Sequence, residues 1–445
     1  MNEASHEREE IRNLLLPKLE QLVDQILAAT RDGGSVVALE EAIATAGDAV
    51  TAEGIATWLR SFDTDAKRVR IDGREFYRFD SVETTYHTSR GTVRLERGVY
   101  REARVHNGPT TVPLELRAGM IGGAWTPACA EAMAYLAQQQ PEREAAETAA
   151  KSGAMKYSPS SFKRLLRVLG ERWERDRDVF ESEVVELSVV PEETASASIA
   201  MDRISLLVLE EDNQLRWRMA YVGAITMYDG KGKPLQTWRY GRMPGEGAHV
   251  LREQMQWDVT ALQERRPTLQ WVALSDGAHE LCGILEEDYP TMPRLVDFWH
   301  VTEKLGTALR ACFPKKDATR TLQKWKMRLL SEDGAIEKIE RVIKRWNRTS
   351  VQAVKDALTY IDNHREQMRY ASVRAQNLPI GSGHVESTCK QLVAMRMKKS
   401  GQRWSHDGGQ AVLTIRSAAL SGRWRPTMDV LLRVFRHEVE ELHAA

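Results

Sequence analysis

The hydrophobic positions between residue 1 and about residue 62 recur at the spacing of amphipathic helices. They include an aliphatic run formed by Leu14, Leu15, Leu16, Leu19, Leu22, Val23 and Ile26. Residues 1–60 carry 5 basic and 11 acidic side chains, a net charge of −6, which is unfavourable for binding DNA. We therefore interpret residues 1–66 as an acidic helical module suited to packing or dimerisation.

Alternation of polar and apolar residues replaces the helical period at residue 67. The segments 74–79 and 92–100 alternate, with turn residues between them, so we expect residues 67–125 to form a small β-rich region. Residues 126–194 return to a helical pattern. Within them, residues 158–170 predict a capped helix with a basic face. That helix fits either a DNA-reading helix-turn-helix or an ordinary surface helix.

A different pattern begins at residue 195. Strands are predicted at 195–208, 217–228, 235–242, 269–277 and 294–299. Asp229-Gly-Lys-Gly supplies a hairpin turn between the second and third strands, and a long helix is predicted over 248–265. This order of strands and helices predicts a mixed α/β sheet over residues 195–303.

A strongly helical segment follows the last predicted strand. Residues 304–348 contain 13 basic and 5 acidic side chains, a net charge of +8. We interpret residues 304–370 as a basic helical insertion, since a loop of this length is uncommon. Residues 371–445 open with the turn Leu378-Pro-Ile-Gly-Ser-Gly, and we expect them to complete the core and to end in helices.

The composition narrows the class of protein. The chain has 445 residues, of which 42% are hydrophobic and 28% charged, and its 63 basic and 63 acidic side chains cancel. Its four widely spaced cysteines favour a reducing compartment over a disulfide framework. No apolar run is long enough to cross a membrane, and the acidic N-terminus is unlike a signal peptide. We expect a cytoplasmic protein without a nucleotide cofactor, because no phosphate-binding loop motif is present.

Three acidic residues stand out by their context. Asp202 lies inside a predicted apolar strand, Asp276 ends another strand, and Glu386 lies near the start of a helix after Gly381-Ser-Gly. A buried carboxylate is costly without a partner, and a pair of Mg²⁺ ions is one such partner. Each residue also has a plain structural interpretation: a paired strand residue for Asp202, a turn for Asp276 and a helix cap for Glu386.

Several motifs together resemble those of the bacterial DDE insertion-sequence transposases, specifically the ISKra-type group, with Mutator-like and ISL3-type enzymes as more distant relatives. The matching segments are Ser275-Asp-Gly-Ala, Val296-Asp-Phe-Trp-His, Pro379-Ile-Gly-Ser-Gly-His-Val-Glu-Ser-Thr-Cys-Lys, Arg396-Met-Lys-Lys-Ser-Gly-Gln-Arg-Trp-Ser, Gly409-Gln-Ala-Val-Leu-Thr-Ile-Arg-Ser and Ser421-Gly-Arg-Trp. The resemblance covers residues 195–425 well and 85–190 loosely. The paired cysteines that many relatives carry near residues 100–108 are absent from this sequence.

The resemblance implies an α/β RNase H-like catalytic core with an all-helical insertion, preceded by mainly helical N-terminal domains with a small β region. It implies DNA strand cleavage and strand transfer that depend on two Mg²⁺ ions, for which Mn²⁺ can substitute. Asp202 and Glu386 match the first and last catalytic acids, and Asp276 is our choice for the middle one. Asp297 also matches a family motif, so Asp297 and His300 remain candidates for the middle ligand or for supporting residues.

The charge distribution suggests how DNA would be held. Residues 246–303 have 4 basic and 11 acidic side chains, a net of −7, whereas residues 363–405 have 8 basic and 2 acidic ones, a net of +6. Basic residues near an aromatic ring suit contact with a nucleic-acid backbone and an unstacked base. The predicted DNA-binding residues are Lys390, Arg396, Lys398, Lys399, Arg403, Trp404, Lys324, Lys326 and Arg328. A solvated helix face, or a core position for Trp404, is the alternative.

The hypothesis from the sequence is a DDE transposase that acts on double-stranded DNA at the transposon ends and the target. Joining two ends favours a homodimer or a higher oligomer, and the expected location is the bacterial nucleoid. The alternatives are a catalytically silent, domesticated DNA-binding protein and another RNase H-like metal nuclease.

Overall fold

The computed structural model describes residues 3–31, 35–153, 155–245, 247–346 and 350–442. Residues 1–2 and 32–34 of the expected N-terminal module and residues 347–349 of the expected insertion lie outside the described residues. The chain forms two compact units. The terminal unit comprises residues 1–180 and 425–445, and the central unit comprises residues 181–424. None of the described helices is long and apolar enough to cross a membrane.

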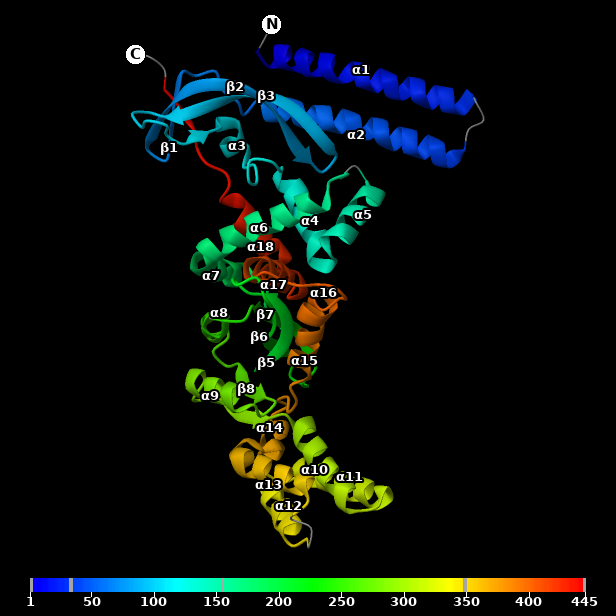
Figure 1. Ribbon diagram of the computed structural model, residues 1–445, viewed down its shortest axis with the longest axis vertical. Helices are drawn as coiled ribbons and strands as arrows, with labels where there is room; N and C mark the ends of the chain where they lie inside the picture. The colour runs from blue at the N-terminus through cyan, green and yellow to red at the C-terminus, as the bar shows by residue number, and fades with distance from the viewer. Residues whose placement is uncertain (1–2, 32–34, 154, 246, 347–349, 443–445) are drawn as a thin grey trace. The chain divides into compact units, whose positions relative to one another are not determined.

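The terminal unit combines helices with an antiparallel sheet (Figure 1). Its helices are α1 (Glu3–Arg31), α2 (Val36–Arg60), α3 (Pro113–Ala118), α4 (Pro127–Gln139), α5 (Glu142–Ser152) and α6 (Pro159–Arg175). Its strands are β1 (Arg68–Ile71), β2 (Arg74–Thr88), β3 (Gly91–Glu102), β4 (Thr110–Thr111) and β10 (Glu440–Glu441). The expected helices and most of the expected β-rich region therefore form, but residues 113–118, inside that region, are the helix α3, which Pro113 begins and Gly119 ends with a φ of +66°.

The sheet of the terminal unit has the order β10-β1-β2-β3-β4. Its outer strand β10 comes from the C-terminus and pairs antiparallel with β1, and Arg70 forms an ion pair with Glu440 at 2.9 Å. This corrects the expectation that residues 371–445 form one part of the core. Residues 425–442 instead belong to the terminal unit, and Glu440 and Glu441 pair with the edge that β1 would otherwise leave open, which agrees with the rule that sheet edges are covered.

Helix α6 is the capped helix that the sequence predicts. Its N-cap is Ser158, whose hydroxyl accepts a hydrogen bond from the Ser161 amide at 3.2 Å. Its apolar face is buried and includes Phe162, Leu165 and Leu169, and its basic residues lie on the other side. Helices α4, α5 and α6 pack against one another within the unit. The helix-turn-helix interpretation of this segment stays a prediction.

The central unit is built on a mixed five-stranded sheet (Figure 1). Its strands are β5 (Ser196–Leu209), β6 (Leu215–Tyr228), β7 (Pro234–Arg242), β8 (Gln270–Ser275) and β9 (Arg294–Val296). The strand order is β7-β6-β5-β8-β9. The first three strands pair antiparallel, whereas β5, β8 and β9 are parallel. The first strand of the unit, β5, is therefore central, and all five predicted strands are confirmed.

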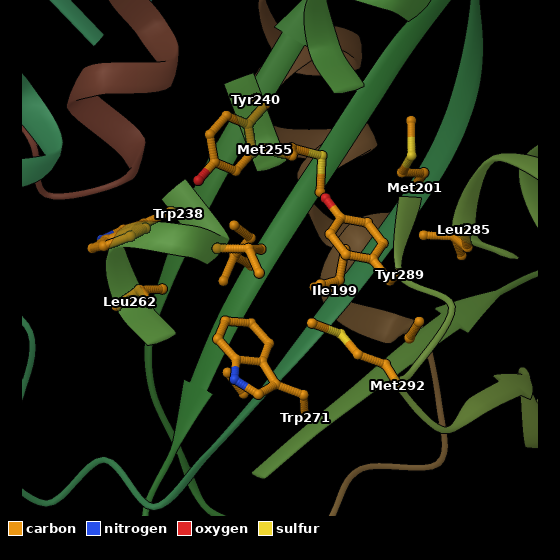
Figure 2. Close-up of a cluster of buried hydrophobic side chains, with 14 of the residues drawn as sticks. Ile199, Met201, Trp238, Tyr240, Met255, Leu262, Trp271, Leu285, Tyr289 and Met292 are labelled. Carbon is orange, nitrogen blue, oxygen red and sulfur yellow. The ribbon is translucent and has the colours of Figure 1, made fainter. Parts of the chain in front are cut away.

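Helices cover both faces of this sheet (Figure 1). They are α8 (Gly247–Arg265) and α9 (His279–Asp288) on one face, and α15 (Gly383–Thr388), η2 (Cys389–Ala394), α16 (Met395–Met397) and α17 (His406–Leu420) on the other. The core under α8 and α9 contains Ile199, Met201, Trp238, Met255 and Leu285 (Figure 2). Burial of this apolar surface is the main term that holds helices and sheet together.

Two glycines on neighbouring strands allow the close approach of these layers. A Cβ atom at Gly223 would lie 2.3 Å from the Met255 sulfur of α8. A Cβ atom at Gly241 would lie 2.7 Å from Leu392 of η2. Both contacts are shorter than real Cβ atoms allow, so a larger residue at either position would require the Met255 or Leu392 side chain to move.

The segment between β9 and α15 is entirely helical among its described residues. It consists of α10 (Phe298–Cys312), α11 (Lys315–Leu329), α12 (Ala335–Lys344), α13 (Gln352–His364), η1 (Arg365–Gln367) and α14 (Tyr370–Ala375). The predicted helical insertion at 304–370 is thus present and begins a few residues earlier. Helix α7 (Arg177–Leu187) contains the boundary between the two units, which the sequence placed near residue 195. Helix α18 (Trp424–Arg433) contains the return to the terminal unit.

Candidate metal centre

Asp202 lies on the central strand β5, and strand geometry decides which way its side chain points. Successive side chains of a strand alternate between the two faces of the sheet. Ala197, Ile199 and Met201 belong to the core under α8 and α9. Asp202 therefore points to the opposite face, which α15 covers.

The Asp202 carboxylate is half-buried and has two close partners. Its Oδ1 accepts a hydrogen bond from the Arg203 amide at 2.6 Å, and its Oδ2 accepts one from the Cys389 thiol at 3.3 Å. Burial raises the pKa of Asp202, and the nearby charge of Asp276 raises it further. These hydrogen bonds and the charge of His300 oppose that shift only in part. A cation in front of this carboxylate would relieve both the burial and the repulsion.

Asp276 follows the last residue of β8, the parallel neighbour of β5. The register pairs Ala200 with Leu274, and Asp202 and Asp276 each lie two residues beyond that pair. Parallel strands in this register bring the two carboxylates to the same face of the sheet. The Oδ1 of Asp276 accepts a hydrogen bond from the Ala278 amide at 2.8 Å, which makes a tight turn.

A residue of the helical insertion contacts the turn after Asp276 and holds it in place. Tyr360 of α13 donates a hydrogen bond from its hydroxyl to the Asp276 carbonyl at 2.8 Å. Gly277 has a φ of +91°, and a Cβ there would lie 2.4 Å from the Tyr360 hydroxyl. Only glycine fits both the backbone conformation and the approach of Tyr360. The helical insertion thereby fixes the direction in which Asp276 leaves its strand.

Glu386 lies on α15, on the face of the sheet where Asp202 points. Its side chain is 54% exposed, and its Oε1 lies 4.0 Å from Nδ1 of His300. The contact with Asp297 raises the pKa of His300 most strongly, and the charges of Glu386 and Asp276 add to that rise. The same two acids, with Asp202, act on the Cys389 thiol. Asp202 and Asp276 thus interact electrostatically, and Glu386 acts on two of the same neighbours, His300 and Cys389, although the three acids are far apart in sequence.

Asp297 has a different environment from the other three acids. Its side chain is 1% exposed, and it caps the N-terminus of α10 by accepting from the amides of Trp299 at 2.6 Å and His300 at 2.9 Å. Its other oxygen accepts from the Ser382 hydroxyl at 2.8 Å and from the Ser382 amide. Burial alone would raise the pKa of Asp297, but the hydrogen bonds from His300 and Ser382 outweigh it and lower the pKa to about 2.

The number of hydrogen bonds that each carboxylate accepts distinguishes Asp276 from Asp297 as a candidate metal ligand. Both oxygens of Asp297 are engaged by four protein hydrogen bonds, so a cation would have to displace part of the cap. Among the described residues, the Asp276 carboxylate accepts one hydrogen bond, on Oδ1 from the Ala278 amide, and Asp276 is only half-buried. Asp276 is therefore the more available of the two carboxylates to a cation, whereas the hydrogen bonds of Asp297 hold the start of α10 and Ser382 in place.

Ligand atoms near this place are close enough for a metal ion. One atom each from Asp297, His300 and Glu386 lies within 4.8 Å of the others. Carboxylate oxygens suit Mg²⁺ and Mn²⁺, and imidazole suits softer transition metals. This group of the described residues contains Glu386 but neither Asp202 nor Asp276, whose carboxylates add further oxygen donors of the kind that Mg²⁺ prefers beside it.

The predicted DNA-binding residues fall into an exposed and a buried group. Lys390, Lys398, Lys399 and Arg403 are exposed, and Lys398 lies 3.4 Å from the Ser205 hydroxyl. In α11, Lys324 and Arg328 are exposed. The Lys326 ammonium lies 5.1 Å from the ring centre of Trp299, an exposed residue at the start of α10. These side chains are available to a nucleic acid.

Arg396 and Trp404 are in the core. Arg396 is 0% exposed and Trp404 is 8% exposed, and the guanidinium lies 5.1 Å from the indole ring centre. The indole Nε1 donates to the Met397 carbonyl at 2.9 Å. Backbone hydrogen bonds also join Trp404 to Leu207 and Leu209 of β5. Their burial is at odds with the predicted DNA contact, and the structure places both residues in the packing of the core.

The sequence interpretation assigned no role to several residues of the site. Cys389 and Ser382 both belong to the motif that carries Glu386, but only the structure shows their contacts with Asp202 and Asp297. Cys389 follows Glu386 by three residues, a spacing that places two helical side chains on one face. That spacing is a signal that could have been used. Tyr360 is too distant in sequence from Asp276 for any local pattern to reveal the contact.

Comparison with known proteins adds no relative. No protein-family model matches the chain, and no curated protein matches it at a significant level. The family resemblance therefore depends on the motifs quoted above.

The hydrogen bonds of Asp297 predict a defined stability effect. We expect Asp297→Asn to lower the free energy of unfolding by about 2 kcal/mol at neutral pH, because an amide cannot accept from four donors. The folded-state pKa of about 2 lies below the ordinary value of 3.8, so the carboxylate stabilises the fold above about pH 4. This contribution decreases as the pH falls toward 2.

Urea denaturation of the metal-free protein at several pH values measures the effect. The difference between wild type and Asp297→Asn should narrow as the pH decreases from 5 toward 3. Asp276→Asn is the matched control and should change stability by less than about 0.5 kcal/mol. Equal effects of the two variants would contradict the structural role of Asp297.

Proposed function

We propose that this protein is a DDE-type DNA transposase that cleaves and joins phosphodiester bonds with the help of Mg²⁺. The observation that carries the proposal is that Asp202 and Asp276 lie in register on one face of the central sheet, and that α15, the helix of Glu386, packs on the same face. One acid comes from the middle strand, one from the end of the adjacent parallel strand and one from a helix across that face. The motifs around these acids resemble those of the insertion-sequence transposases.

The architecture of the central unit supports an RNase H-like core. Three antiparallel strands are followed by two parallel ones, with the first strand in the centre of the sheet. The helical segment between β9 and α15 interrupts the unit before the last acid, as the family resemblance implies. Two strand positions and one helix position are also where the resemblance places the three catalytic acids.

The chemistry follows from the donor set. Two divalent ions would supply an activated water or 3′-hydroxyl and would stabilise the leaving 3′-oxygen. Asp202 is centrally placed and half-buried, which suits a carboxylate shared by both ions. Asp276 and Glu386 would each hold one ion, and the hydrogen bond from Tyr360 keeps the Asp276 turn in place. Hydrolysis and strand transfer then use the same residues, and no covalent bond to the protein is needed.

The surface charge supports a DNA substrate. The stretch around Glu386 has a net charge of +6, and it includes the exposed residues Lys390, Lys398, Lys399 and Arg403; Lys324 and Arg328 of α11 are exposed as well. Basic side chains of this kind neutralise phosphates and bring a polyanion to carboxylates that would otherwise repel it. The DNA of the bacterial nucleoid is the substrate that we propose.

We predict that three acids are needed for DNA cleavage and one is not. Asp202→Asn, Asp276→Asn and Glu386→Gln should each reduce cleavage of the element's own ends by at least about 100-fold, because each removes an anionic metal ligand. Asp297→Asn should retain part of the activity at a temperature where it stays folded. The measurement is an in vitro cleavage and strand-transfer assay with Mg²⁺ or Mn²⁺, with end binding followed in parallel.

The outcomes of this assay separate the proposal from its alternatives. Wild type that binds the ends but does not cut with either metal would indicate a silent DNA-binding protein. Cleavage of DNA without preference for the ends and without joining would indicate another metal nuclease. Loss of activity in Asp297→Asn with full activity in Asp276→Asn would reverse our choice of the middle acid.

The exposed basic residues should act through phosphates. We expect Lys390→Ala or Lys324→Ala to weaken binding of the ends and to reduce the slope of log affinity against log salt by about one. Both substitutions should weaken binding to the transposon ends and to random DNA by the same factor. Lys315→Ala, at the start of α11, removes a basic residue outside the proposed contact surface and is the matched control. Fluorescence anisotropy at several salt concentrations measures the slope, and unchanged slopes would contradict the contact.

We also propose that the protein works as a homo-oligomer joined through α1. Leu16, Leu19, Val23 and Leu27 recur at spacings of three and four residues and remain 39–53% exposed within the described residues. A stripe of this kind favours packing against a second helix, and the net charge of −6 disfavours DNA as its partner. The double variant Leu19→Lys, Val23→Lys should lower the molar mass in light scattering to that of the monomer. Gln21→Lys is the control, and a monomeric wild type would contradict the proposal.

A further inference from the structure

The hairpin of β5 and β6 carries an apolar surface that extends beyond the helices covering the rest of its face. The register pairs Leu207 with Trp217 and Leu209 with Leu215, so these four side chains lie on one face of the hairpin. Nearer the centre of the sheet, α8 and α9 cover this face. Trp217 is 64% exposed, and Leu209 and Leu215 are exposed as well. An indole ring near the end of the hairpin is therefore open to solvent.

Lys398 lies beside this ring, although it belongs to the helical layer on the other face of the sheet. Beyond the end of β8, the segment after α16 follows the open edge of β5, where the Trp404 amide donates a hydrogen bond to the Leu207 carbonyl at 3.1 Å. At this edge, the Lys398 ammonium lies 3.4 Å from the Ser205 hydroxyl and 5.9 Å from the ring centre of Trp217. An exposed cation and an exposed aromatic ring thus lie side by side.

The basic run at 396–403 has a different aromatic neighbour from the one that the sequence suggests. Proximity in sequence pairs this run with Trp404, which is 8% exposed and packed in the core. The exposed ring beside Lys398 is that of Trp217, which comes from a distant part of the chain. A basic and aromatic surface is therefore present, but β6 supplies its ring.

The charges around this ring favour a polyanion as the occupant of the surface. Alternation along β6 places Arg216 and Arg218 on the opposite face, where they form ion pairs with Asp212 at 2.6 Å and Glu210 at 2.5 Å. Lys398 is therefore the cation beside the ring. Lysine is depleted in the cores of protein–protein interfaces, whereas an aromatic ring next to a basic side chain is typical of surfaces that bind single-stranded nucleic acids. A nucleic acid thus fits this surface better than a second copy of the chain.

We propose that Trp217 and Lys398 form a binding site for an unpaired base of a DNA single strand. The indole stacks on the base, and the ammonium contacts an adjacent phosphate. Stacking does not read the hydrogen-bonding edge of a base, so the site accepts different sequences. Leu207, which lies opposite Trp217, is five residues from Asp202 along β5, or about 17 Å. The binding claim stands by itself, whereas the placement of this strand next to the metal centre rests on the proposed function.

Binding of single-stranded DNA to the metal-free, full-length protein tests the site. The probes are a fluorescein-labelled oligodeoxythymidylate and a blunt duplex of the same length, and fluorescence anisotropy measures their affinities. Trp217→Ala should weaken binding of the oligodeoxythymidylate by about 10-fold, because stacking is lost, and should change binding of the duplex by less than about 2-fold. Trp217→Phe keeps a ring and should recover most of the affinity. Trp217→Leu keeps only apolar area and should not.

Two further variants separate the ring from the charge. Trp257→Ala removes an indole that is 39% exposed on α8, and it should bind the oligodeoxythymidylate like wild type. Lys398→Ala should weaken binding and reduce the slope of log affinity against log salt by about 0.7, because one phosphate contact to a single strand is lost. Trp217→Ala should leave that slope unchanged.

The other outcomes decide against the site or against the proposed function. Equal affinity of Trp217→Ala and wild type for the oligodeoxythymidylate, or full affinity in Trp217→Leu, would overturn the stacking site. A lower molar mass of Trp217→Ala than of wild type in light scattering would make this surface an interface between copies of the chain and would also overturn it. If wild type binds the oligodeoxythymidylate through Trp217 but never cleaves DNA, the proposed function fails and the site stands. If wild type cleaves the transposon ends and Trp217→Ala binds equally well, the site fails and the proposed function stands.

Discussion

The carboxylate of Asp297 joins the parts of the central unit that must meet at the candidate metal centre. The backbone amide of Asp297 donates a hydrogen bond to the carbonyl of Ser275 at 2.7 Å, and Ser275 is the last residue of β8, next to Asp276. One carboxylate oxygen caps α10, the first helix of the insertion, and the other binds Ser382 just before α15. One buried residue thus connects the strand end that carries Asp276, the insertion, and the helix that carries Glu386. If this contact failed, the last acid would lose its fixed position relative to the sheet.

The arrangement concentrates negative charge where burial makes it costly. Burial and the charge of Asp276 raise the pKa of Asp202. Hydrogen bonds to both oxygens of Asp297 instead lower its pKa and keep it ionised. The centre therefore contains two kinds of carboxylate. One is satisfied by the protein and holds the structure, and the others are incompletely satisfied and accessible. A site that folds with unsatisfied acids close together is suited to bind cations, and it gains stability when it does.

The sequence was sufficient to predict the elements but only part of the site. Regular alternation revealed β5, β6 and β7, and the apolar run before Asp276 revealed β8, because local burial patterns determine both. The role of Asp297 could not be predicted, since its partner Ser382 is reached only after the whole insertion. Arg396 and Trp404 looked like a basic and aromatic DNA surface because their charge and ring are visible in sequence, whereas their burial depends on packing against β5. The strand β10 escaped notice because two glutamates give no strand pattern without β1 beside them.

The most direct test of the account is anomalous diffraction from crystals of the protein bound to a transposon end and soaked with Mn²⁺. We expect two manganese peaks that share the Asp202 carboxylate, with Asp276 at one and Glu386 at the other, while Asp297 keeps its contacts with Ser382 and the start of α10. Peaks on Asp297 in place of Asp276, or no peak at Asp202 with DNA present, would contradict the central claim that these three acids form the catalytic centre.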